Sequence, residues 1–543
     1  MKIIIALLLS CFAASSAQLS INIGTANNDG TGDTLRSAFA KVNTNFTTLF
    51  SGITTWGNSV FVATNGNDST GTRNNPAFPF ATPYAAVQAA TSGDTVFVFP
   101  GTYHTATNLW KNGVNMIFYQ CSLTSTNRTN DGGFALFDDR FYSGGVTSRV
   151  QFAGSKLIWS AFSDRQTNAN GSLSTLRPTN TIGAIVVTNP LSDITWIGGG
   201  IDYDMVQPSM SLGALAVVNC RTSYWEFPDG INDQRRHLGN VYIGVDEVSD
   251  PVYATAAGCA IYWERGEMFV KAGQLSGTAY TLWPNTDFAS YPRQITNNLW
   301  VTADFMDGKI YSTSGATNYD WKIWVDVKEH RNGTNQYFPS PIWLSGGSSF
   351  YYRSFKTAEF SGQDQGSSGG PLMFVTTNSY GTYGGQPRAW VTSQKWSSPG
   401  AFIANYGGDI RSVNVDDYEL IRGQYTAAMT LPGIANYPSV NGNIRIMGGS
   451  MTITNGFGIL HAGGTTDVFG LRLTTLGFTN SPVVARTNGL VLTSVRIVNT
   501  NSIAVASDVN ATNTVTMQSV WLNAVTGKVV TAVGPVLTNL FVR

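Results

Sequence analysis

GLRLTTLGFTN (470–480), GLVLTSVRIVN (489–499), TVTMQSVWLN (514–523) and GPVLTNLFV (534–542) follow one another near the end of the chain. The four segments align on three apolar columns, which are Leu473, Leu492, Met517 and Leu537, then Leu476, Val495, Val520 and Leu540, then Phe478, Ile497, Leu522 and Val542. Within each segment the apolar residues lie two or three apart, and Val, Thr and Ile are frequent, as is typical of strands. A short strand pattern that returns after 19, 25 and 20 residues predicts a stacked β-solenoid.

The composition supports the same fold class. Of the 543 residues only 12% are charged and 57 are glycine, whereas an average soluble protein is about 25% charged. Many short strands need many turns, so we expect an all-β chain. Lysines plus arginines equal the acidic residues at 33 each, and this balance predicts no nucleic-acid partner.

The sequence carries no signature of a bound cofactor. It contains no phosphate-binding loop, dinucleotide fingerprint, EF-hand loop or zinc signature, so we expect no cofactor and no metal. Cys121, Cys220 and Cys259 are scattered through strand-like contexts without Cys-x-x-Cys spacing. This pattern predicts buried, unreactive thiols rather than a disulfide framework.

We expect five successive parts: an apolar segment (1–17), an attachment segment (18–56), the entry and first coils of the solenoid (57–223), an aromatic-rich central part (224–430) and the C-terminal coils (431–543). The first part, MKIIIALLLSCFAASSA, fits a secretory signal peptide cleaved before Gln18. It is too short to cross a bilayer, so we expect no membrane span.

The attachment segment combines a Gly/Asn/Asp loop with a helical pattern. Asp33 is a good N-cap, and a heptad seam of Leu35, Phe39, Val42, Phe46 and Leu49 follows, which predicts an oligomerisation face. The segment resembles the N-terminal part of tailed-phage fibre and spike proteins at Gly24, Thr25, Asn28, Asp29, Gly30, Thr31, Gly32, Asp33, Leu35, Arg36, Ala38, Phe39, Asn43, Asn45 and Phe46. The resemblance implies a homotrimer that docks on other virion tail proteins.

A second resemblance begins at residue 59. Val60 to Val62 and Val96 to Phe99 predict strands, and Pro83 to Ala90 predicts a helix that could cover the open end of a solenoid. The stretch resembles the entry segment of pectin-lyase-like proteins at Asn67, Asp68, Gly71, Thr72, Pro79, Phe80, Thr82, Ala85, Gly93, Asp94, Thr95, Pro100, Gly101, Thr102 and Tyr103. This resemblance implies a right-handed parallel β-helix, and it implies fold rather than activity. Further strands are expected at 114–119, 150–159, 184–188, 194–203 and 215–219.

The central part is rich in large aromatic residues, and its repeat is hard to see. Exposed tryptophans stack on sugar rings and anchor interfaces, whereas buried ones fill a wide core or a seam between subunits. Both interpretations stay open here. The candidate glycan-binding residues are Trp225, Trp263, Trp283, Trp321, Trp324, Trp343, Trp390 and Trp396.

Hydrolysis of a glycan needs two carboxylates about 5 to 10 Å apart. Asp202 and Asp204 are two residues apart in the strand-like IDYD and would project to one face about 7 Å from each other. They are the candidate catalytic pair. Looser alternatives are Asp229 with Asp233, Glu264 with Glu267, Asp416 with Glu419, and a lyase site at Arg235, Arg236 and His237.

The two resemblances together imply a tail fibre or tailspike-like virion protein that binds polysaccharide on the host surface without cleaving it. Two alternatives remain: a tailspike polysaccharide depolymerase, and a secreted bacterial β-helix adhesin that uses the signal peptide. A mature N-terminus at Gln18 would favour the secreted protein, and an intact Met1 would favour the virion.

Overall fold

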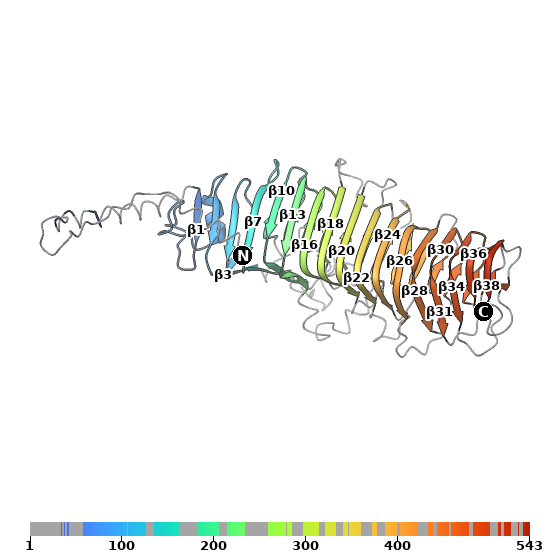
Figure 1. The fold of residues 1–543 in the computed structure, drawn as a ribbon. Coiled ribbons are helices and arrows are strands. Elements are labelled where there is room, and N and C mark those ends of the chain that lie inside the picture. Colours follow the sequence, from blue (N-terminus) through green and yellow to red (C-terminus); the bar gives the residue numbers. More distant parts are fainter. Residues whose placement is uncertain are drawn as a thin grey trace, which may run out of the picture.

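The computed structural model describes residues 58–105, 107–125, 135–161, 183–205, 214–233, 259–277, 280–284, 297–313, 321–332, 340–345, 347–359, 372–376, 386–398, 402–420, 433–437, 442–454, 458–476, 482–499, 509–511, 515–522, 530–531 and 536–542, with Thr34, Ser37, Lys41 and Val42. Within these residues the chain is nearly all parallel β-strand, as the sequence predicts. Its strands follow one another in sequence order along an elongated body (Figure 1).

The larger sheet has 24 strands and the smaller one 14. The larger sheet contains β1 (Ser59–Val62), β2 (Thr95–Val98), β3 (Gly101–Thr105), β4 (Asn115–Tyr119), β5 (Cys121–Ser125), β7 (Thr147–Ala153), β8 (Lys156–Ala161), β10 (Asp193–Ile197), β11 (Gly200–Met205), β13 (Thr222–Phe227), β14 (Gly230–Asp233), β16 (Glu267–Ser276), β18 (Asn297–Asp307), β20 (Trp321–Asn332), β22 (Ser349–Glu359), β24 (Arg388–Ser398), β26 (Asp409–Leu420), β28 (Asn443–Thr454), β30 (Thr465–Phe469), β31 (Arg472–Leu476), β33 (Leu490–Thr493), β34 (Arg496–Asn499), β36 (Val515–Leu522) and β38 (Val536–Val542).

The smaller sheet contains β6 (Phe137–Asp138), β9 (Ile185–Val187), β12 (Leu215–Val217), β15 (Cys259–Trp263), β17 (Tyr280–Pro284), β19 (Ile310–Thr313), β21 (Ile342–Ser345), β23 (Met373–Thr376), β25 (Ile403–Tyr406), β27 (Ile434–Asn436), β29 (Ile459–His461), β32 (Val483–Ala485), β35 (Val509–Ala511) and β37 (Val530–Thr531). Each strand pairs in parallel with its equivalents one coil before and one coil after. For example, β10 lies between β7 and β13. Such stacking is a parallel β-helix-like architecture.

The core runs along the inside of the coils. In β18, Leu299, Val301 and Ala303 are buried, while Trp300 between them faces outward. This alternation follows from the period of two in a strand. The predicted thiols Cys121, Cys220 and Cys259 are confirmed as free and buried, and burial raises the pKa of the Cys220 thiol to about 12. The largest fully buried side chains include Trp110, Trp159, Trp196, Trp225, Trp263 and Trp396.

Two of the three apolar columns predicted near the end of the chain are confirmed for the last three of the four aligned segments. Leu492, Met517 and Leu537 pair in register, as do Ile497, Leu522 and Val542. The first segment is misaligned, because Leu492 pairs with Val468 rather than Leu473, and Leu473 pairs with Ile497. The physical reason is that β30 and β31 are two strands of one coil with similar apolar alternation, so the pattern alone does not distinguish them.

Glycine corners divide stretches that the sequence predicts as single strands. The expected strand at 150–159 is two strands, β7 and β8, separated at Gly154 with φ of 59°. The expected strand at 194–203 is likewise β10 and β11, separated at Gly198 and Gly199 with φ of 87° and 70°. A positive φ lets the chain turn sharply at little steric cost when the residue is glycine.

The predicted helix near the first coil is present as α3 (Pro83–Ala89). The hydroxyl of Thr82 caps it by accepting from the Ala85 N–H at 3.2 Å, and Asp68 accepts from the backbone N–H of Thr82 at 2.9 Å. The helix packs against β1, β2 and β3. That it covers the open end of the core stays a prediction. Of the residues described, none belongs to a helix long and apolar enough to cross a bilayer.

Candidate functional site

Five aromatic side chains form a stack on the outer face of the larger sheet. Phe269, Trp300, Trp324, Tyr351 and Trp390 occupy matching positions on β16, β18, β20, β22 and β24, and we call them the outer ladder. Successive ring centroids lie 4.3, 4.8, 5.3 and 4.6 Å apart. Their planes deviate from parallel by 1°, 3°, 10° and 9°.

Strand spacing sets this geometry. Neighbouring parallel strands lie about 4.8 Å apart, so rings at one register position stack almost face to face. Each aromatic pair contributes about 0.5 to 1.5 kcal/mol beyond its buried area. All five side chains are half-buried. Stacked rings cover one another's faces, and their edges are therefore the part of the ladder that meets solvent.

Rows of charged and hydroxyl side chains border the outer ladder. One row lies two residues after the ladder position on each strand. In it, Lys271 forms an ion pair with Glu226 at 3.1 Å, and Arg353 forms an ion pair with Asp326. Thr392 continues the same row on β24. The hydrogen bond to Glu226 raises the pKa of the Lys271 ammonium. The result is a strip of aromatic carbon beside a row of hydrogen-bonding groups.

A second aromatic column lies along the smaller sheet. It comprises Tyr262, Trp283, Tyr311, Trp343, Phe374, Tyr406 and Tyr437. Its rings pack at mixed angles, from 6° between Tyr406 and Tyr437 to 90° between Tyr262 and Trp283. The Lys309 ammonium lies 4.9 Å from the ring centroid of Trp343. This column lacks the regular parallel faces of the outer ladder.

The candidate tryptophans fall into three groups. Trp225, Trp263, Trp321 and Trp396 are buried inside the solenoid. A buried ring offers no face to a sugar, so the core interpretation holds for these four and the glycan-binding expectation is corrected. Trp324 and Trp390 belong to the outer ladder, and Trp283 and Trp343 belong to the second column.

Three members of the outer ladder are absent from the predicted set: Phe269, Trp300 and Tyr351. A signal for them exists in the sequence, because each ladder ring precedes an inward-facing apolar residue and then a polar one, as in Phe269-Val270-Lys271 and Trp300-Val301-Thr302. The motif recurs at Trp324, Tyr351 and Trp390. Loops of unequal length between the coils hide its period.

The predicted catalytic pair is only partly described. Asp202 lies on β11 and forms an ion pair with Lys156 at 3.1 Å. The side chain of Asp204 lies outside the described part of the chain, so the pair stays a prediction. The alternatives fare no better: Glu264 is buried and accepts from the Tyr262 hydroxyl, whereas the side chains of Asp233, Asp416 and Glu419 and residues 235–237 lie outside the description.

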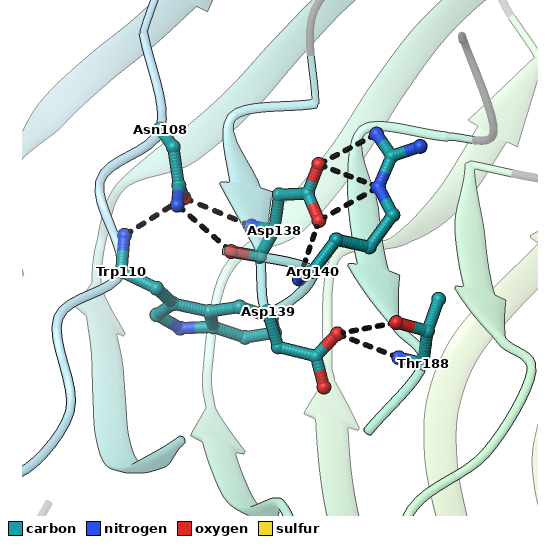
Figure 2. Close-up of polar contacts among 6 residues, drawn as sticks. All are labelled: Asn108, Trp110, Asp138, Asp139, Arg140 and Thr188. Carbon is teal, nitrogen blue, oxygen red and sulfur yellow. Dashed lines mark hydrogen bonds and ion pairs between the residues drawn. The ribbon is translucent and has the colours of Figure 1, made fainter. Parts of the chain in front are cut away.

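Two adjacent carboxylates that the sequence analysis did not single out lie at β6. Asp138 accepts from Arg140 through both of its oxygens, at 2.6 to 3.0 Å, and its backbone is bracketed by the Asn108 amide (Figure 2). The Oδ1 atom of Asn108 also accepts from the Trp110 backbone N–H at 3.0 Å. These contacts tie the segment before β4 to the turn after β6.

The second carboxylate, Asp139, is fully buried. Its Oδ1 accepts from the Thr188 N–H and hydroxyl (Figure 2). Its Oδ2 accepts from the Asn189 N–H at 2.9 Å and the Ser192 hydroxyl at 2.8 Å. Burial raises the pKa of this carboxyl, a common property of catalytic acids. Because four protein donors satisfy both oxygens, Asp139 supports the 188–192 turn and presents no group to a substrate.

Of the predicted oligomerisation seam, Val42 is described and is half-buried, while Leu35, Phe39, Phe46 and Leu49 lie outside the description. Across the described ranges, no cluster of three or more His, Cys, Asp or Glu is placed to hold a metal ion. Comparison of the chain with family models, with curated proteins and with solved structures finds no match in any of the three.

Proposed function

We propose that this protein is a fibre- or spike-like adhesin that binds polysaccharide on a bacterial surface through the outer ladder, without cleaving it. The observation that carries the proposal is the parallel stack of Phe269, Trp300, Trp324, Tyr351 and Trp390 on an outward face. Sugar rings have apolar C–H faces and a rim of hydroxyls, and such ligands suit aromatic carbon bordered by charged and hydroxyl groups.

The wider context of the proposal comes from the sequence. The resemblance of residues 24–46 to phage fibre proteins favours a homotrimer attached to a virion, and the entry segment favours a right-handed β-helix whose first helix covers the core. Export through residues 1–17 would instead make the same body a secreted adhesin. In either setting the outer ladder lies on β16 to β24, along the middle of the elongated solenoid rather than at β1 (Figure 1).

The proposal is tested with purified full-length protein on a panel of bacterial capsular polysaccharides and lipopolysaccharide O-chains. Retention of each polymer is measured by affinity electrophoresis, and chain length is followed by size-exclusion chromatography. A triple variant, Trp300→Leu, Trp324→Leu and Trp390→Leu, removes the indoles of the ladder. Phe469→Leu is the matched control, because Phe469 is exposed on the same sheet outside the ladder.

We expect at least one polymer to be retained at constant chain length, with retention lost in the triple variant and kept in Phe469→Leu. Circular dichroism measures whether both variants keep their strands. Shortening of any polymer would replace the proposal with a depolymerase. Retention of no polymer, or equal retention by the triple variant, would refute binding through the ladder.

A further inference from the structure

The two ends of the outer ladder differ. Inside the ladder, both faces of Trp300, Trp324 and Tyr351 lie against neighbouring rings. At the first end the column continues with Tyr224, the register partner of Phe269. At the last end the register partner of Trp390 is Ser412 on β26. Among the described residues, no ring packs on that second face of Trp390.

A β-bulge lies at this point of the sheet. Ala389 pairs with Ile410, but Trp390 pairs with Ser412, so Arg411 is an extra residue in β26. Ile410 and Val413 are buried, while Arg411 is exposed and Ser412 is half-buried. A bulge places two consecutive side chains on one side of a strand and redirects them. The guanidinium and the hydroxyl therefore both project outward beside the Trp390 ring.

A buried carboxylate orients the guanidinium. Asp409 is 5% exposed, and its Oδ2 lies 2.6 Å from the Nε atom of Arg411. Held in this way, the guanidinium loses little conformational freedom when it also binds a ligand, and its remaining N–H groups stay in a fixed fork. The end of the ladder thus combines an indole face, a small hydroxyl side chain and an oriented set of donors.

We propose that this end of the ladder is a subsite for one pyranose residue of a polysaccharide, stacked above Ser412 on the face of Trp390 that no described ring covers. The sugar occupies the place where a sixth ladder ring would lie, because strand spacing and ring stacking have the same repeat. Its C–H face meets the indole, and its hydroxyls accept from Arg411 and exchange hydrogen bonds with Ser412. This subsite rests on the proposed function, and stacking on Trp390 is its principal contact with the polysaccharide.

The deciding variant is Ser412→Phe. A phenyl ring at this position extends the ladder by one member and covers the Trp390 face on the Ser412 side, while every existing ladder residue is kept. An added stack favours the fold, so loss of binding would not come from unfolding. Ser412→Ala is the matched control, since it removes the hydroxyl but leaves the face open. Phe469→Leu is the second control, because Phe469 is exposed on the same sheet but lies outside the ladder.

Binding is measured by isothermal titration with hexasaccharides of glucose, N-acetylglucosamine and galacturonate, and with the polymers of the panel. For the tightest of these probes we expect Ser412→Phe to raise Kd at least about tenfold and Phe469→Leu to raise it less than about threefold. A blue shift of tryptophan emission on binding should be present in the native chain and absent in Trp390→Phe.

Binding by the native chain that is unchanged in Ser412→Phe overturns the subsite and leaves the proposed function standing. No binding of any probe by the native chain overturns both. Sedimentation of Ser412→Phe provides the remaining control, because dissociation of an oligomer would place the Trp390 face between subunits and refute the sugar subsite.

Discussion

The Nδ1 atom of His330 lies 3.0 Å from the hydroxyl oxygen of Tyr352 inside the solenoid. On the other side of the ring, Nε2 lies 2.8 Å from the Gly308 carbonyl oxygen, which can only accept. Nε2 therefore carries the proton, and Nδ1 accepts from Tyr352. The Tyr352 hydroxyl in turn lies 2.7 Å from that of Thr357, so Tyr352 can donate to Nδ1 of the neutral imidazole and accept from Thr357.

This arrangement predicts instability in acid. Burial lowers the pKa of His330 to about 4, whereas an unfolded histidine titrates near 6.5. Between these two pH values the unfolded chain binds a proton at this histidine and the folded chain does not. The free energy of unfolding is therefore highest above about pH 6.5 and falls toward pH 4. The linkage amounts to about 3 kcal/mol. Guanidinium unfolding followed by tryptophan fluorescence at pH 7 and pH 4 measures the difference.

The control for this prediction is His330→Gln, whose amide can hydrogen-bond to both neighbours without titrating. We expect a smaller stability difference between the two pH values in this variant. A residual slope should remain, because burial also lowers the pKa of His461. An equally steep loss in His330→Gln would assign the acid sensitivity to other groups.

A second prediction concerns the buried amides of Asn405 and Asn436, which stack on successive coils. The Asn405 amide donates to the Asn436 Oδ1 at 3.1 Å, and the Asn436 amide donates to the Gly442 and Thr465 carbonyl oxygens. Asn436→Ala leaves these groups buried without that partner, at a cost of about 1 to 3 kcal/mol. Asn298→Ala on the outer face should change stability by less than about 0.5 kcal/mol. Similar effects of the two substitutions on the denaturation midpoint would contradict the role of the interior stack.

Asp139→Asn tests the carboxylate in Figure 2. The new NH₂ group would face one of the two donor sets, either at Thr188 or at Asn189 and Ser192. A buried donor left without an acceptor costs about 1 to 3 kcal/mol, so the thermal midpoint should fall. Asp202→Asn is the surface control, because exposed ion pairs contribute less than about 1 kcal/mol. Equal midpoints for the two variants would show that the turn does not depend on Asp139.

Strand positions can be predicted from the sequence more reliably than the register between strands. Short strands with period-two alternation, such as β2 and β4, are readable because one face of each is buried by neighbouring coils. Register is harder, and the misplaced Leu473 shows why: adjacent strands of one coil carry the same alternation, and only the three-dimensional path of the corner at Gly470 separates them.

The sequence predicts that the central part carries an aromatic surface, but it does not predict which aromatic residues form that surface. The excess of aromatic residues in the central part is visible in the sequence, yet Trp225 and Trp390 differ in exposure only because one faces inward and the other outward. A shift of one residue along a strand reverses that direction. Stacking between coils adds contacts, such as that of Trp300 with Trp324, between residues whose separation varies with loop length.

The last prediction separates two reasons for glycine at the coil corners. Gly464 has φ of 61°, and a Cβ atom there would lie 1.8 Å from the Gly442 carbonyl oxygen, whereas Gly93 has φ of 93° and nothing within 4 Å of its Cβ position. Gly93→Ala should cost only the left-handed backbone penalty, about 1 to 2 kcal/mol. Gly464→Ala must also push two coils apart, so we expect a larger fall in the thermal midpoint and a lower soluble yield. If the two variants unfold at the same temperature, backbone conformation alone, and not the close approach of coils, explains the glycine at position 464.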